Sequence, residues 1–218
     1  MRELSRGSRY KIVGGCITPR PIAWVCTRSP AGVLNVSPFS YFNVLGDDPP
    51  VVVLGMVAHA EGRLKDTPEN IRASGQFVIN LVDEAHGEAM NLTSVDAPAD
   101  VDEAVLAGLE LAPCVEVSPP RIATAPVSFE CRTMHFIETG LHQVAIIGEV
   151  LHAHIQDRFI QDKERMRLDI SAMNLIARLH GAGWYGRQTD MFEMFRPAWK
   201  DMREAAGGAP VPEGSSQG

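Results

Sequence analysis

Six short β-prone segments dominate this sequence, and turn residues rather than long helices separate most of them. Their valine, isoleucine and aromatic residues predict strands at residues 22–27, 33–36, 51–57, 76–82, 127–137 and 144–155. In the fifth segment, Val127, Phe129 and Cys131 alternate with polar residues, which indicates a strand with one buried face. A turn at residues 30–32 predicts a hairpin, and Gly148 predicts a bulge or bend in the last strand.

Helices are fewer, and we expect them at residues 67–75, 83–92, 100–108 and 171–179. In the first of these, Thr67 can act as the N-cap, Pro68 suits the first turn and Gly75 can end the helix. Because the helices do not alternate with the strands as repeated βαβ units, the pattern predicts a mainly β fold, an antiparallel barrel or sandwich with peripheral helices. We expect one domain over residues 1–200 and a flexible tail rich in proline and glycine over residues 201–218.

The composition fits a globular chain and argues against some partners. Of the 218 residues 45% are apolar, which is enough to bury a full core. The net charge of −7 and the lack of clustered basic residues argue against a large nucleic-acid footprint. No apolar run approaches the roughly 18 residues that span a bilayer, and no signal peptide is recognisable. We therefore expect no membrane partner and a cytoplasmic protein, with the four cysteines as buried or half-buried thiols.

Two motifs that suggest other chemistry can be set aside. Residues 181–186 match G-x-G-x-x-G, but they follow a predicted helix and do not open one, so a dinucleotide-binding fingerprint is not expected. His152 and His154 are residues of the type that binds metals. We expect their rings to point to opposite faces of a strand, and therefore predict no metal site.

Three segments combine polar and aromatic residues in patterns that suit a small ligand. Arg20 stands between two prolines and offers a planar donor fork for a phosphate or carboxylate. Residues 35–43 interleave asparagine and serine with aromatic rings, a lining suited to a flat heteroaromatic ligand. Lys65 precedes a helix N-terminus, where unpaired N–H groups favour an anion. Each segment alone also has a plainer interpretation: a surface arginine, an irregular strand and a capped surface helix, with Trp24 as a core residue.

Taken together, these segments resemble the flavin reductase-like family of FMN-binding split-barrel proteins, including the flavoredoxin type. The similarity lies in residues 18–24 (TPRPIAW), 35–43 (NVSPFSYFN), 48–50 (DPP), 65–67 (KDT) with Asn70, and 77–82 (FVINLV). The resemblance implies a six-stranded Greek-key split barrel that binds FMN near a homodimer interface. It also implies that the following residues bind the cofactor: Arg20, Pro21, Ile22, Ala23, Trp24, Asn35, Pro38, Phe39, Ser40, Tyr41, Phe42, Lys65, Asp66, Thr67 and Asn70.

The activity implied by the resemblance is hydride transfer from NADH or NADPH to bound FMN, with electrons passed to an acceptor or to a partner oxygenase. No catalytic side chain is assigned, because the flavin itself carries this chemistry. Two alternatives stay open at this point. One is an FMN-binding electron carrier without NAD(P)H turnover of its own, and the other is a binding module that keeps the barrel without flavin.

Overall fold

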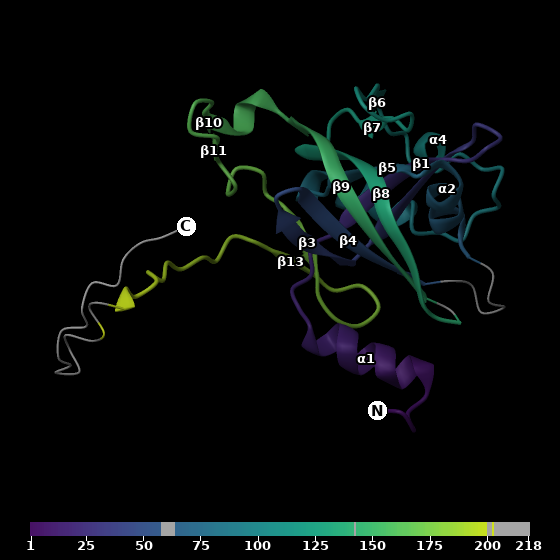
Figure 1. Ribbon diagram of the computed structural model, residues 1–218, viewed down its shortest axis with the longest axis horizontal. Coiled ribbons are helices and arrows are strands. Elements are labelled where there is room, and N and C mark those ends of the chain that lie inside the picture. The colour runs from purple at the N-terminus through teal and green to yellow at the C-terminus, as the bar shows by residue number, and fades with distance from the viewer. Residues whose placement is uncertain (58–63, 142, 200–201, 203–218) are drawn as a thin grey trace, which may run out of the picture.

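A computed structural model describes residues 1–57, 64–141, 143–199 and 202. Strands form most of its regular structure (Figure 1). The longer strands are β1 Ala23–Arg28, β2 Leu34–Phe39, β3 Tyr41–Asp47, β4 Pro50–Val57, β5 Gln76–Leu81, β8 Val127–Gly140 and β9 Gln143–Ile155. The short ones are β6 Leu111–Ala112, β7 Arg121–Ile122, β10 Ile160–Asp162, β11 Arg167–Leu168, β12 Ile176–Arg178 and β13 Tyr185–Arg187. The α-helices are α1 Arg6–Cys16, α2 Asp66–Ser74, α3 Gly87–Leu92 and α4 Glu103–Leu106, and 3-10 turns cover Glu84–His86 and Asp157–Phe159.

The seven longer strands make one antiparallel sheet in the order β2-β1-β5-β8-β9-β4-β3. Its first and last strands, β2 and β3, are separated in the chain by Ser40 alone. They are two halves of one bent strand, so the sheet closes on itself through the chain at Ser40. Counted in this way the barrel has six strands, which agrees with the expected mainly β, six-stranded barrel.

Alternate residues of the central strands pack into two different apolar layers. Trp24 and Cys26 of β1 belong to one cluster, which also contains Met90 of α3 and Ala104 of α4. The residues between them, such as Val25, belong to a second cluster formed with β4, β5 and β9. Strand β1 is therefore buried on both faces, and the side helices cover what would otherwise be its solvent face.

The expected hairpin forms, because strand β1 pairs with β2 across the turn at residues 30–32. Strand β3 was not among the expected strands, and it pairs with β4 across residues 48–49. Strand β8 departs from the one-sided pattern, since Ser128 and Glu130 on its polar face are buried as well. At Gly148 of β9 an added Cβ would lie 2.5 Å from Cζ of Phe77. The paired strand β8 has a register shift next to this position, between Thr133 and His135. Glycine is needed there because an aromatic ring fills the space.

Three expectations about local structure were wrong, and a fourth, the helix over residues 100–108, was right in place but too long. Residues 171–179 form turns and strand β12, not a helix, because backbone hydrogen bonds tie Ile176 to Val82 and Arg178 to Arg20. Helix α2 begins at Asp66 with Lys65 as its N-cap, so Thr67 lies inside the first turn; Gly75 does end it, with φ of 70°. The third expected helix, over residues 100–108, shortens to α4. Cys16 is exposed, although all four cysteines are free thiols.

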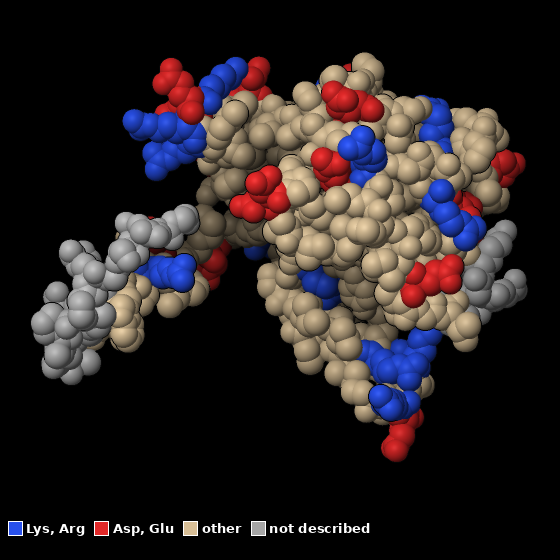
Figure 2. Space-filling model, in the orientation of Figure 1, with Lys and Arg blue, Asp and Glu red and all other residues tan. Residues whose placement is uncertain are grey.

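Helix α1 has no counterpart among the predicted helices. Its apolar side chains spread around the helix, and Tyr10, Ile12 and Val13 are 40–52% exposed, so no regular apolar stripe marks it in the sequence. Basic side chains gather over this helix (Figure 2). Of the expected tail at 201–218, all but Met202 lies outside the described residues. Among the helices that the structure describes, none has the length and apolar character needed to cross a bilayer.

Candidate flavin site

A buried hydrogen-bonded network joins strand β2 to helix α2. Asn35 Oδ1 accepts hydrogen bonds from the hydroxyl groups of Thr67 (2.6 Å) and Thr27 (3.3 Å), and Asn70 Nδ2 donates to Thr27 Oγ1 (3.1 Å). The amide Nδ2 of Asn35 donates to Glu103 Oε1 at 2.9 Å. All five residues are at most 8% exposed. The tertiary structure thus brings together three of the predicted site residues, Asn35, Thr67 and Asn70.

Sequence reasoning missed Thr27 and Glu103 in this network. The Glu103 carboxylate also accepts the backbone N–H of Val36 at 3.2 Å. Burial raises the pKa of Glu103, and these hydrogen bonds oppose the rise. The only sequence signal at this point is Asp102, which caps α4 by accepting from two backbone N–H groups. Capping explains why a helix starts there but does not reveal that Glu103 reaches β2.

A small cavity of about 50 Å³ adjoins the network. Its walls come from β2, α2 and the segment before α4. They consist of Ser29, Val33, Asn35, Asp66, Asn70, Ala99, Val101 and Glu103. The volume suits ordered water more than an organic ligand. The network therefore supports the surface above it and leaves no room for a flavin within it.

Among the described residues, Lys65 is the basic side chain at the N-terminus of α2. Lys65 is 42% exposed at its side chain, and its Nζ lies 3.4 Å from Asp96 Oδ1. Asp66 and Glu69 occupy the first turn of the helix, and the Thr67 hydroxyl points inward to Asn35. Lys65 can therefore reach an anion in solvent, since an exposed ion pair of this kind is weak and exchanges partners easily.

Arg20 is directed at the protein itself. Its guanidinium donates to the backbone carbonyls of Gly14, Ile17 (2.7 Å) and Leu179 (2.9 Å), and Nε donates to Ser40 Oγ at 3.4 Å. The residue is 6% exposed. These contacts tie the end of α1 and the segment after β12 to the bend between β2 and β3. The structure thus assigns the fork a clamping task, in contrast to the anion contact expected from the sequence.

Trp24 lies in the core and shows no surface to a ligand. Its side chain is 0% exposed, and Nε1 donates to Thr93 Oγ1 at 2.8 Å. Ile22 and Ala23 are also buried, at 4% and 0%, while Pro21 is half-buried. The plainer interpretation of Trp24 as a core residue therefore fits this structure, and stacking of its indole on a flavin does not.

The aromatic run at the β2–β3 bend is accessible along its whole length. Pro38, Phe39, Ser40, Tyr41 and Phe42 are all half-buried. Phe39 and Phe42 both pack against the second apolar cluster, which holds their rings in place. Tyr41 lies between the Arg20 guanidinium, 5.9 Å from its ring centre, and the ring of Tyr10. Residues 38–42, part of the run 35–43 that the sequence predicts to line a site for a flat ligand, are therefore accessible at this bend.

The histidines of β9 were wrongly expected to point apart. Residues two apart on a strand share a face, and the ring centres of His152 and His154 lie 4.7 Å apart. His154 Nε2 also lies 2.5 Å from Glu130 Oε1, and the Cys114 thiol is part of the same cluster. The Glu130 carboxylate already accepts the backbone N–H groups of residues 115–117 at 2.6–3.1 Å. Donors therefore occupy both oxygens, which leaves the cluster a structural role in holding that loop.

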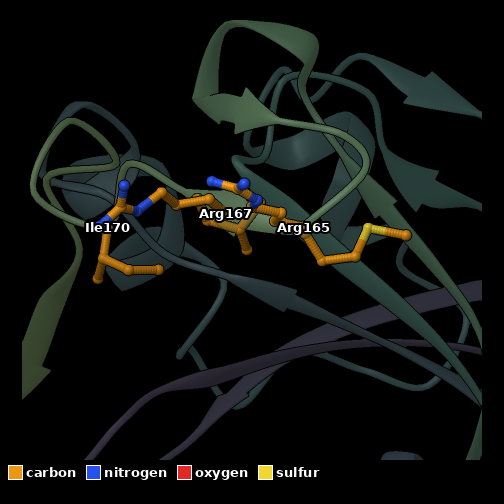
Figure 3. Close-up of a pocket in the computed structure, with 5 residues that line it drawn as sticks. Arg165, Arg167 and Ile170 are labelled. Carbon is orange, nitrogen blue, oxygen red and sulfur yellow. The ribbon is translucent and has the colours of Figure 1, made fainter.

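A broad hollow of about 610 Å³ lies apart from all these residues, at the β10–β11 hairpin (Figure 3). Arg165, Met166, Arg167, Leu168 and Ile170 line it. No predicted site residue belongs to its lining, and its floor comes from one short segment of the chain. It is a surface depression beside the hairpin and adds nothing to the site at α2 and the β2–β3 bend.

Comparison with known proteins identifies the family. Residues 15–167 match the family model for the flavin reductase like domain, so the chain belongs to the flavin reductase-like family. An uncharacterized protein from Deinococcus radiodurans is 36% identical over 208 residues, covering 94% of this chain and 91% of that protein. A split-barrel structure from Shewanella frigidimarina, 19% identical, has a TM-score of 0.74 over 90% of this chain and 96% of that one, which bears out the split-barrel fold.

Two other solved structures are more similar in sequence to this chain than the Shewanella frigidimarina protein is. The 2-nitrobenzoate 2-nitroreductase NbaA of Pseudomonas fluorescens is 32% identical, with a TM-score of 0.82 over 91% of this chain and 95% of that chain. Component B of the nitrilotriacetate monooxygenase of Bacillus cereus is 30% identical, with a TM-score of 0.83 over 88% and 96%. The likeness extends over almost the whole length of both proteins.

Proposed function

We propose that this protein binds FMN and catalyses hydride transfer from NADH or NADPH to the flavin. The observation that carries the proposal is the match of residues 15–167 to the flavin reductase family, together with near full-length similarity to a nitroreductase and to a monooxygenase component. The protein is thus proposed to be an oxidoreductase, and it keeps the split barrel that the family shares.

In this proposal the residues at α2 and at the β2–β3 bend meet the two ends of FMN. Lys65 would meet the phosphate, because it is the exposed cation at a helix N-terminus. Ser40 and the half-buried ring of Phe39 would meet the flat ring system. The buried network of Thr67, Asn70 and Asn35 would support the site without touching the ligand, because it fixes α2 against β2. For Arg20 and Trp24 we propose support of the site in place of direct contact.

When bound, FMN would accept a hydride from the nicotinamide and hold the two electrons for the next acceptor. The protein's own residues have the tasks of binding and orientation. The side chain of Asn35 is fixed in one orientation. Its amide oxygen accepts a hydrogen bond from Thr67, and its NH₂ group donates one to Glu103. Preorganised polar groups of this kind lower the cost of ordering a ligand.

The proposed partners are a second copy of the chain and an electron acceptor. Similarity to a monooxygenase component supports an oxygenase that takes reduced flavin. Similarity to a nitroreductase supports direct reduction of a nitroaromatic compound. Anaerobic reduction with NADH or NADPH, followed by addition of 2-nitrobenzoate or of air, separates these two functions. Fast reoxidation of the flavin by the nitro compound supports direct nitroreduction. Release of free reduced flavin supports supply to an oxygenase.

Binding is tested by titrating the protein with FMN and with riboflavin and following the flavin absorbance. Lys65→Ala should weaken FMN by about 10- to 100-fold and riboflavin much less, because a hydrogen bond to a charged group contributes roughly 1.5–3 kcal/mol. Lys163→Ala is a matched control, since Lys163 is another exposed lysine paired with an aspartate, Asp157, at 3.3 Å. Equal losses for both ligands would contradict the phosphate role, and absence of flavin binding to the wild type would refute the proposal.

A further inference from the structure

The segment that follows β13 carries an unusual density of exposed apolar side chains. We define the C-terminal arm as residues 188–199, drawn in yellow-green in Figure 1, where it runs away from the barrel. Its large apolar residues are Met191 (64% exposed), Phe192 (85%), Met194 (80%), Phe195 (84%) and Trp199 (76%). Single exposed apolar side chains are ordinary, but five on one short segment form a patch of the kind that marks an interaction site.

In the described part of the chain, no polar contact holds this arm against its own barrel. Residues 188–197 make no hydrogen bond or ion pair to other described residues. The segment just before it is firmly held, because β13 pairs with β12 and β12 bridges to Arg20. The arm therefore leaves the body at a fixed point, with its aromatic rings in solvent.

An apolar groove on the barrel has the character needed to receive such side chains. It has a volume of about 420 Å³ and lies where β9 continues past the β3–β4 hairpin. Its lining is mainly apolar and includes Phe42, Val44, Val52, Phe129, Val150 and Leu151. Val44 is 69% exposed and its neighbour Leu45 is 58% exposed, so the apolar surface continues beyond the groove along β3.

The area on offer matches what a stable dimer requires. Three aromatic side chains that each bury 150–250 Å² supply roughly 500 Å² per arm at the exposures observed. Two arms and the equal surfaces that they cover would bury about 2,000 Å² of accessible surface in total, whereas a standard interface buries about 1,600 Å². Reciprocal exchange between two copies also closes the assembly, because each copy gives one arm and receives one. The arm alone thus provides enough surface.

We infer that residues 188–199 are an exchange arm that docks in the β3–β4–β9 groove of a second copy of this chain. The inference rests on the homodimer proposed above but not on flavin binding. The occupant of the groove is the partner's arm, with Phe192 and Phe195 as the main anchors, since aromatic residues in pockets carry most of the binding energy at interfaces.

Directed crosslinking tests this arrangement in the full chain, in a Cys16→Ser background that removes the exposed thiol. Chains with Phe195→Cys alone and chains with Val44→Cys alone are mixed and oxidised. A disulfide-linked dimer that forms only in the mixture supports exchange. An intrachain link in the Val44→Cys/Phe195→Cys chain, with none in the mixture, would show that the arm folds onto its own barrel and would overturn the inference.

Sedimentation of the Phe192→Ser/Phe195→Ser variant provides the second measurement. We expect its dimer to dissociate at least about 100-fold more readily, because four buried rings are lost per dimer. Val105→Ser is the control, because Val105 is 78% exposed on α4 and far from the arm in sequence. An unchanged dimer would overturn the inference, as would a wild-type monomer that binds phosphatidylcholine vesicles. Flavin absorbance recorded on the same samples separates loss of the dimer from failure of the proposed flavin site.

Discussion

Glu130→Gln should destabilise this protein more than any surface change of an acid to its amide. Glu130 is 0% exposed in the middle of β8, and its two oxygens hold the backbone N–H groups of Val115, Glu116 and Val117 together with His154. Burial alone would raise the pKa of Glu130, but the hydrogen bonds from His154 and from these backbone groups lower it to about 2. The carboxylate is thus held in its charged form by the loop that it anchors.

The size of the effect follows from this pKa. A fall from the ordinary value of 4.5 to about 2 corresponds to about 3 kcal/mol of folding free energy at neutral pH. Glutamine has the same shape, but its NH₂ group would face N–H donors and leave at least one of them unpaired, which adds roughly 1 kcal/mol or more. We expect the unfolding free energy of Glu130→Gln to be about 3–4 kcal/mol below that of the wild type.

Urea unfolding followed by circular dichroism measures the difference at several pH values. Because the folded pKa is depressed, the stabilisation by Glu130 is complete above about pH 4.5 and is lost as the pH falls toward 2. The gap between wild type and variant should therefore be widest at neutral pH and shrink in acid. Glu149→Gln is the matched control, because Glu149 pairs on the surface with Arg132 at 2.9 Å and should cost under about 1 kcal/mol. A gap below 1 kcal/mol at pH 7, or one independent of pH, would refute the reasoning.

Two further changes test packing and the clamp at α1. Gly148→Ala should lower the unfolding free energy by about 1–3 kcal/mol, because its Cβ would lie 2.5 Å from the Phe77 ring. Gly140→Ala, with no atom within 4 Å of the new Cβ, should change it little, and equal effects in urea unfolding would contradict this. Arg20→Gln should speed amide hydrogen exchange in α1 by roughly tenfold or more, since its bonds to Gly14 and Ile17 are lost. Unchanged exchange would mean that other contacts hold the helix.

Local signals in the sequence were sufficient for six of the seven longer strands, with β3 as the exception. The alternation and turn residues of β1, β2, β4, β5, β8 and β9 come from side chains within a few positions of each other, so a linear sequence reports them directly. Gly75 was read correctly as a helix end for the same reason, since a left-handed residue is a local requirement. The motifs at residues 18–24 and 35–43 likewise indicated the family, which the comparison confirmed.

Only the tertiary structure decided which partners the polar residues take. Arg20 faces carbonyls up to 159 positions away, and Asn35 meets Thr67 and Glu103 from two separate helices. The strand at residues 176–178 likewise depends on Arg20 and Val82, contacts that no local pattern encodes. Periodicity shows which face of a segment is apolar, but a hydrogen bond between distant residues depends on how the whole chain closes. The mainly β class therefore followed from the residue pattern and the barrel from the family resemblance, whereas the clamp, the buried network and the free arm emerged from the fold.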